Sequence, residues 1–75
     1  MGRRNPQTAR RDLARNLRKL RLARGWSQDD LAAEANVRQA LVSAIEVGTA
    51  NPTLNSLELL SGALDVGLSD LFARH

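Results

Sequence analysis

The sequence predicts an all-α fold, a compact bundle of five helices in one domain. Leucines recur at helical spacing, as at Leu13, Leu17 and Leu20. No segment alternates apolar and polar residues in the way a β-strand requires. Residues that end helices separate the apolar stretches by links of about two to six residues, so neighbouring helices must pack against one another.

The first helix is expected to start at Pro6, because proline suits the first helical position, with Asn5 before it as the N-cap. The three leucines form its apolar stripe. Gly25 accepts the left-handed conformation that ends helices, so the helix should stop there.

A second helix is expected after Ser27, an N-cap residue followed by Asp29 and Asp30 in the turn where the helix dipole favours acids. Asn36 is the best non-glycine candidate for a left-handed residue and should end this helix after about eight residues. The inner face of the helix is predicted to hold Leu31, Ala32 and Ala35.

The third helix is expected from about Arg38 to Val47, with Val42 and Ile45 facing inward and Gly48 ending it. Pro52 then breaks the chain, and Thr53 can cap a fourth helix. The apolar stripe of the fourth helix is predicted to be Leu54, Leu57, Leu60 and Leu64. A short fifth helix should start near Ser69 and bury Leu71 and Phe72.

Positive charge is concentrated at the start of the chain. Residues 1–27 hold nine Arg or Lys side chains and one acid, a net charge of +8, whereas the remainder carries −5. We therefore divide the chain into a basic arm, residues 1–5, and a domain, residues 6–75. Charge alone leaves three interpretations open: a surface for duplex DNA, a surface for anionic membranes, or a solvated helix face.

Catalysis and metal binding have few residues to use. The chain has no cysteine and a single histidine, the terminal His75, so the common nucleophile and base pairs cannot be built. The acids are scattered and lack clustered partners for a metal. We expect a protein that is not an enzyme, needs no cofactor and, lacking a signal or membrane-spanning segment, is cytoplasmic.

The two helices around Asn36 have the length and turn of a helix-turn-helix. Such pairs are common in small bundles, but a longer ordered set of residues resembles the phage repressor and Cro-type family, also called the xenobiotic-response-element family. These residues are Leu17, Leu20, Arg21, Gly25, Ser27, Gln28, Leu31, Ala32, Val37, Val42, Ser43, Ile45, Glu46, Gly48, Asn51, Pro52, Leu57, Leu60, Leu64, Val66 and Leu71.

The resemblance implies a lambda-repressor-like domain whose third helix enters the major groove of double-stranded DNA, usually as a homodimer. Small single-domain members, such as restriction-modification controller proteins, look similar. Arg21 and Glu46 match a family ion pair that bridges the first and third helices. The expected DNA-binding residues are Gln28, Arg38, Gln39, Ala40, Ser43, Ala44, Thr49, Asn51, Arg21, Arg10 and Arg11.

The sequence departs from the family pattern at two places. Arg38 replaces the usual hydroxyl-bearing cap of the third helix, and it supplies the single charge on that helix's outer face. We therefore predict modest sequence readout through Arg38 or Gln39 and a larger share from phosphate contacts and DNA shape. The second departure is Asp65 where the family usually has glycine, followed by Gly67 where it has a capping residue.

The main hypothesis is a sequence-specific transcriptional regulator, little more than its DNA-binding domain, so a dimer interface must come from the same domain. The candidates, each of which could equally be core, are Leu59, Leu68, Leu71 and Phe72. The competing hypothesis is a protein-interaction module, such as an antitoxin or antirepressor, whose third helix meets a protein through its small apolar face. The two hypotheses differ in salt dependence, because DNA binding should fall steeply as salt rises, whereas binding to a protein should depend only weakly on salt.

Overall fold

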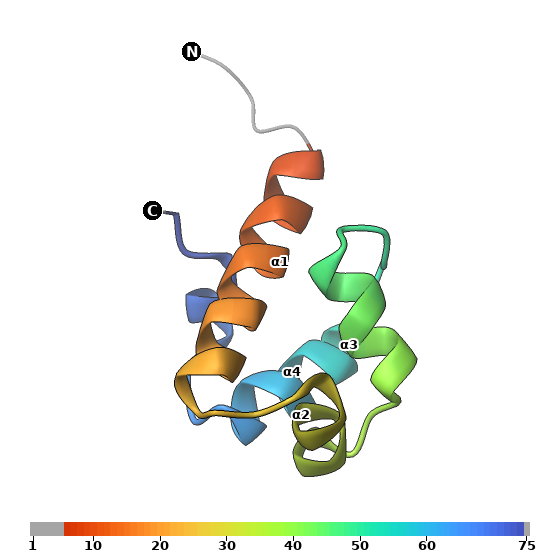
Figure 1. The fold of residues 1–75 in the computed structure, drawn as a ribbon. Helices are drawn as coiled ribbons and strands as arrows, with labels where there is room; N and C mark the ends of the chain where they lie inside the picture. Colours follow the sequence, from red (N-terminus) through yellow and green to blue (C-terminus); the bar gives the residue numbers. More distant parts are fainter. Residues whose placement is uncertain (1–5, 75) are drawn as a thin grey trace.

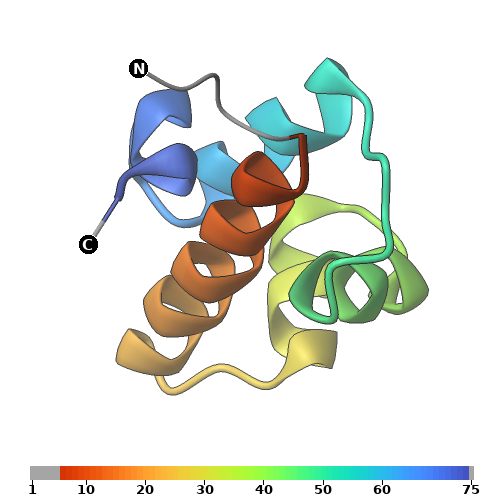
Figure 2. The same cartoon turned by 90° about the horizontal axis from the view of Figure 1, so that it is seen from above.

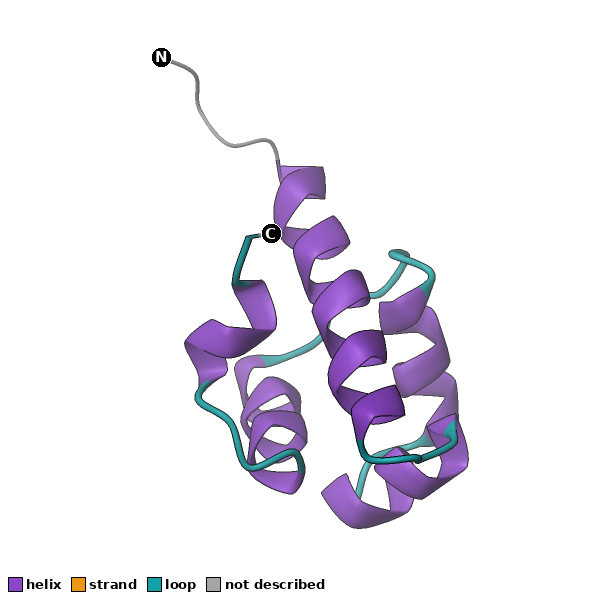
Figure 3. Ribbon diagram, turned by 60° about the vertical axis from the view of Figure 1, so that its left-hand side comes forward, coloured by secondary structure: helices purple, strands orange, loops and turns teal. Residues whose placement is uncertain are grey.

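The structure is a computed structural model that describes residues 6–74. It contains α1 (Pro6–Ala23), α2 (Gln28–Ala35), α3 (Gln39–Glu46) and α4 (Leu54–Ala63), followed by the 3-10 helix η1 (Leu68–Phe72). The described residues form helices and loops and no strand (Figure 3), which confirms the all-helical prediction. The predictions for the arm, residues 1–5, which includes the Asn5 cap, and for His75 lie outside the described residues.

Within residues 6–74 the structure has four α-helices. The expected short fifth helix is present as a 3-10 helix of five residues, and the count of five α-helices is not confirmed. So short a segment makes few α-helical hydrogen bonds, and tighter bonds to the third residue along the chain replace them. The Asp70 amide donates to the Gly67 carbonyl at 3.0 Å, and the Asp70 carboxylate accepts from the Gly67 amide at 2.8 Å.

The ends of the helices follow the predicted chemistry. The Ser27 side chain accepts from the Asp30 amide, and the Thr53 side chain accepts from the Ser56 amide. Asn36 is left-handed, with φ 58° and ψ 45°. Asp65 is also left-handed, with φ 56°, a conformation that glycine adopts more readily than aspartate. These boundaries depend on local residue type, which explains why they were predictable.

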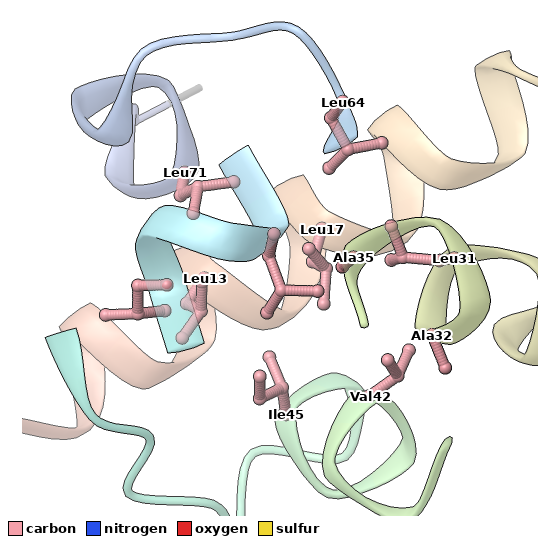
Figure 4. Packing of buried hydrophobic residues seen from close by; sticks show 11 residues of the cluster. Leu13, Leu17, Leu31, Ala32, Ala35, Val42, Ile45, Leu64 and Leu71 are labelled. Atoms are coloured by element: carbon pink, nitrogen blue, oxygen red, sulfur yellow. The ribbon is translucent and has the colours of Figure 1, made fainter. Parts of the chain in front are cut away.

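One small core joins all the elements (Figure 4). The members named by prediction and buried in the structure are Leu13, Leu17, Leu31, Ala32, Ala35, Val42, Ile45, Leu57, Leu60, Leu64 and Leu71. The prediction that Leu54 belongs to the inner stripe of α4 is wrong, because its side chain is 61% exposed. Leu54 is the first residue of α4, and Leu57, one turn further on, is the first buried residue of that helix.

Helix α1 runs through the middle of the domain, with α3 on one side and η1 on the other (Figures 1 and 2). The buried Asn16 amide ties the end of the chain to α1, donating to the carbonyls of Leu71 at 3.0 Å and Ala73 at 2.7 Å. Helix α2 packs on α3 and α4. Since α3 rests on α1 and α2, its remaining side is left uncovered.

Candidate nucleic-acid interface

The turn between α2 and α3 is built by three residues, Asn36, Val37 and Arg38. The Asn36 amide donates to carbonyls in the last turn of α2, and the Val37 amide donates to the Ala32 carbonyl at 3.0 Å. The left-handed conformation of Asn36 reverses the chain, so that α3 starts three residues later, at Gln39. Ala32 is buried at this junction, where a small side chain lets the two helices approach. The result is a pair of eight-residue helices joined by a tight turn.

A chain of hydrogen bonds links α1, α2 and α3. Arg21 holds Glu46 with two bonds, from Nε to Oε2 at 2.7 Å and from Nη2 to Oε1 at 2.9 Å. The Gln28 amide donates to Glu46 Oε1 at 3.1 Å, and the Gln39 amide donates to Gln28 Oε1 at 3.2 Å. These hydrogen bonds therefore connect a buried ion pair to the first residue of α3.

The ion pair is charged at neutral pH. Burial raises the pKa of Glu46, but hydrogen bonds from Arg21 and Gln28, together with the charges of Arg21 and Arg18, outweigh burial and leave that pKa below its ordinary value. The bond to Glu46 raises the pKa of Arg21. Arg21 is only 8% exposed, and its Nη1 also donates to the Trp26 carbonyl at 2.8 Å. Arg21 thus serves as an internal anchor.

The outer face of α3 is smooth and nearly uncharged. Gln39 and Ala40 are exposed, and Ser43 and Ala44 are partly exposed. Arg38 is exposed at the N-cap and makes no capping bond with its side chain. This agrees with the expectation that its helix start is less well satisfied than a hydroxyl cap would make it. A narrow face of small side chains can approach a partner closely.

The loop after α3 places further predicted residues beside this face. Thr49 and Asn51 are exposed, and the Thr49 hydroxyl donates to the Ala44 carbonyl at 3.4 Å. Arg10 reaches the same loop from α1, its Nε donating to the Ala50 carbonyl at 3.4 Å. Arg11 is exposed and lies apart from Arg10, in a groove between α1 and the end of α3. The structure therefore brings Arg10 to the loop but separates it from Arg11.

Of the two alternatives that the sequence left open for the candidate dimer residues, Leu71 takes the place in the core. Leu71 is 0% exposed, so as a core side chain it offers no surface to a second subunit. The reason is that η1 turns it toward α1, where Asn16 holds the backbone. Leu59 is 40% exposed, whereas Leu68 and Phe72 are partly buried against the core.

Two features of the site were not predicted from the sequence. The Gln28–Gln39 contact joins residues eleven apart, and the only signal was an amide side chain at the start of each helix. The Trp26 carbonyl that accepts from Arg21 carried no signal at all. Within residues 6–74 no cluster of acids, His or Cys could hold a metal, and no helix is long and apolar enough to cross a membrane.

Comparisons with known proteins place this geometry in a family. A family model described as helix-turn-helix matches residues 17–71. A hypothetical transcription factor from Neisseria meningitidis is 37% identical over 65 residues, which cover 87% of this chain and 61% of that protein. This chain thus spans less than two thirds of that relative's length.

Solved structures of similar proteins have the same fold. The restriction-modification controller protein C.AhdI from Aeromonas hydrophila is 33% identical, with a TM-score of 0.80 over 84% of this chain and 96% of its own. The controller protein C.Esp1396I, solved as a tetramer with its natural 35 base-pair operator, is 30% identical, with a TM-score of 0.74 over 92% and 88%. The match of the family model, the fold and the paired helices show that this chain belongs to the Cro/C1-type helix-turn-helix family.

Proposed function

We propose that this chain is a transcriptional regulator that binds double-stranded DNA sequence-specifically, with α3 in the major groove. The observation that carries the proposal is the hydrogen-bond chain that ends on Gln39, at the start of an exposed helix face. The C.Esp1396I structure with its operator supports it, because that protein shares the fold and binds DNA. The major groove of B-DNA is about 12 Å wide and admits one α-helix.

Gln39 is the residue we assign to base recognition. One N–H of its side-chain amide donates to Gln28 Oε1, which leaves the side-chain carbonyl oxygen and the second N–H available for a base edge. One acceptor and one donor match N6 and N7 of adenine, whereas guanine presents two acceptors. Gln39 therefore favours adenine, and the methyl groups of Ala40 and Ala44 suit the methyl group of thymine.

Phosphates account for the larger share of affinity. Arg38 is exposed at the start of α3, and Thr49 and Asn51 follow at its other end, with Arg10 beside them. Arg11 adds charge along α1. The arginines attract phosphate whatever the base sequence, and binding falls with salt because the phosphates that they neutralise release counterions. Thr49 and Asn51 can add neutral hydrogen bonds to phosphate. Gln28 and Arg21 act as positioning residues, because their hydrogen bonds are directed to Glu46 and Gln39.

We also propose that the regulator is a homodimer whose interface centres on Leu59, with Leu68 and Phe72 at its edge. Leu59 is a large apolar side chain that the core leaves exposed. The tetramer of C.Esp1396I supports assembly of this fold on DNA. Sedimentation of the wild type and of Leu59→Asp tests this interface: the variant should sediment as a monomer, and an unchanged dimer contradicts the assignment.

The main test selects duplexes from a random library at two salt concentrations. The wild type should enrich one sequence containing adenine, and its affinity should fall steeply as salt rises. Gln39→Ala should reduce the preference at that adenine by about tenfold or more, because a paired contact contributes about 1–3 kcal/mol of discrimination. Asn55→Ala, an exposed amide on α4, is the matched control and should leave the preference unchanged.

Arg38→Ala should weaken binding, and Arg74→Ala is its control because it removes the same charge from an exposed site outside α3. Failure to enrich any sequence, with binding only at low salt, overturns sequence-specific recognition. A second candidate function, a protein-interaction module of the antitoxin or antirepressor kind, is favoured by the small apolar face of α3. In that case partner binding should depend weakly on salt and be abolished by Ala40→Trp, while Gln39→Ala is tolerated.

A further inference from the structure

A groove of about 620 Å³ lies between α1 and the C-terminal end of α3. One wall is the α1 face that carries Arg11, Arg18 and Leu22, and the other is formed by Glu46 and Val47. Its chemistry is mixed, because basic side chains and exposed apolar side chains line the same space. The proposed DNA contacts use Arg11 at one end of the groove and leave the rest of it without a role.

The basic side chains of the groove are available to a partner. Arg11, Arg18 and Lys19 make no hydrogen bond or ion pair to any residue that the structure describes, although the charge of Arg18 influences Glu46. Arg15 is occupied, because it binds Asp12 at 2.9 Å and the Ala73 carbonyl at 3.3 Å. Arg11 and Arg18 are seven residues apart and so face the same side of α1, about 10 Å apart along its axis.

The apolar side chains of the groove are unusually exposed. Leu22 is 53% exposed on the α1 wall of the groove, beyond Arg18, and Val47 is 68% exposed on the opposite wall. Among residues 6–74, only Leu54 and Leu59 are comparably exposed large apolar side chains, and neither lines this groove. Leu22 and Val47 therefore add exposed apolar surface to a groove that also carries unpaired cations.

We propose that this groove binds an acidic amphipathic helical segment of a partner protein. Two carboxylates spaced seven residues apart on such a segment would face Arg11 and Arg18, and an apolar side chain four residues further would cover Leu22. A DNA phosphate strand would satisfy the arginines but leave Leu22 and Val47 in water. The segment uses both features, and burial of apolar area stabilises the complex.

A second copy of this chain fits the groove less well. The acids of α2, Asp29, Asp30 and Glu34, have no large exposed apolar side chain among the residues of that helix. On α4, Leu54 and Leu59 accompany a single acid, Glu58. Neither helix offers two acids at the required spacing followed by an apolar residue, so the observations favour a different protein.

A designed peptide tests the proposal with the full 75-residue chain. The labelled peptide is a helix of about 18 residues that carries two glutamates seven positions apart and a leucine four positions beyond the second. Binding is measured by fluorescence anisotropy at two salt concentrations. We expect the wild type to bind the peptide saturably and more weakly as salt rises. The Arg18→Glu variant should bind the peptide more than tenfold more weakly. A peptide in which arginine replaces the glutamate facing position 18 should restore the affinity of that variant.

Two further variants keep the test decisive. Arg74→Glu makes the same charge change at an exposed residue outside the groove and should alter affinity by less than about twofold. Leu22→Ser removes apolar surface without changing charge and should weaken binding by about tenfold. Circular dichroism of each variant should match the wild type, since the substituted side chains are exposed.

Four results overturn the proposal. The first is that the peptide does not bind, and the second is that Arg74→Glu weakens peptide binding as much as Arg18→Glu does. Another is that Arg18→Glu and Leu22→Ser leave peptide binding intact, while Arg18→Glu lowers the affinity for all DNA duplexes alike. That result would assign the groove to contact with DNA phosphates. The last is that Arg18→Glu changes the oligomeric state, which assigns the groove to a second copy. Selection of duplexes by the wild type is a separate measurement, so the proposed DNA function can fail or hold independently.

Discussion

The two helices of the helix-turn-helix start in different ways. At the start of α2 the Ser27 hydroxyl accepts from the Asp30 amide at 3.0 Å, and the Asp30 carboxylate accepts from the Ser27 amide at 2.8 Å. At the start of α3 the Arg38 side chain makes no capping bond. The Ser27 side chain thus caps the Asp30 amide of α2, whereas no side chain caps α3, where the Leu41 amide donates to the Arg38 carbonyl at 3.0 Å instead.

The difference shows how stability and binding are assigned to separate places. Helix α3 is held by Val42 and Ile45 in the core and by Glu46 at its C-terminal end. Its N-terminal turn, with Gln39 linked only to Gln28, is left for a ligand. An uncapped N-terminus carries partial positive charge, which favours phosphate, so a weakly capped start suits a helix that approaches DNA.

The strongest test of this division removes the C-terminal anchor of α3. Glu46→Ala leaves the buried Arg21 guanidinium without its partner, and we expect a loss of about 3 kcal/mol in the free energy of unfolding. Urea denaturation followed by circular dichroism measures it. Glu58→Ala, on the exposed side of α4, should change stability by less than about 0.5 kcal/mol. Equal effects of the two substitutions contradict the role of the anchor.

Part of that stabilisation titrates with pH. The fold lowers the pKa of Glu46, so its contribution is complete above the pKa of glutamate in an unfolded chain, about 4.3, and is lost as pH falls through the lower folded pKa. The stability difference between wild type and Glu46→Gln should therefore shrink as pH falls below about 4. Unfolding measured from neutral pH to acid checks this, with Glu58→Gln as control. A difference that is independent of pH is the contrary outcome.

Substitutions at the N-cap residues of α2 and α3 test the two helix starts directly. Ser27→Ala should cost about 1 kcal/mol, because it removes the cap of α2. Arg38→Ser should stabilise the domain by about 0.5–1 kcal/mol, because it supplies a cap that α3 lacks, while it weakens DNA binding through the lost charge. Thermal unfolding and duplex titration of both variants measure the two effects. If Arg38→Ser destabilises the domain, the start of α3 is satisfied in another way.

The smallest effect is expected away from both starts, at the end of α4. Asp65 is left-handed, and Asp65→Gly relieves this conformation while it increases the freedom of the unfolded chain. We expect a net gain of about 0.5 kcal/mol. Asn36→Gly is the comparison, because asparagine tolerates the left-handed region well, and its gain should be smaller. A loss of stability at position 65 instead indicates that the aspartate side chain stabilises the turn.

Much of the fold was predictable because it depends on neighbouring residues. Ser27 and Thr53 each hold an amide three residues away, and Asn36 adopts a conformation that its own side chain favours. The leucine stripe of α1 needs only helical spacing. The prediction failed where tertiary packing decides: Leu54 has the helical spacing of the buried Leu57, yet its side chain is exposed at the first residue of α4.

The sequence by itself determined the helices, their caps, the left-handed turn at Asn36 and the residue types at the candidate interface, since each follows from a few adjacent residues. Tertiary structure decided which of those residues meet. The contact of Gln28 with Gln39, the burial of Arg21 and the groove beside Leu22 and Val47 each join separate helices. No local pattern encodes such contacts, because they depend on how the helices pack around one shared core.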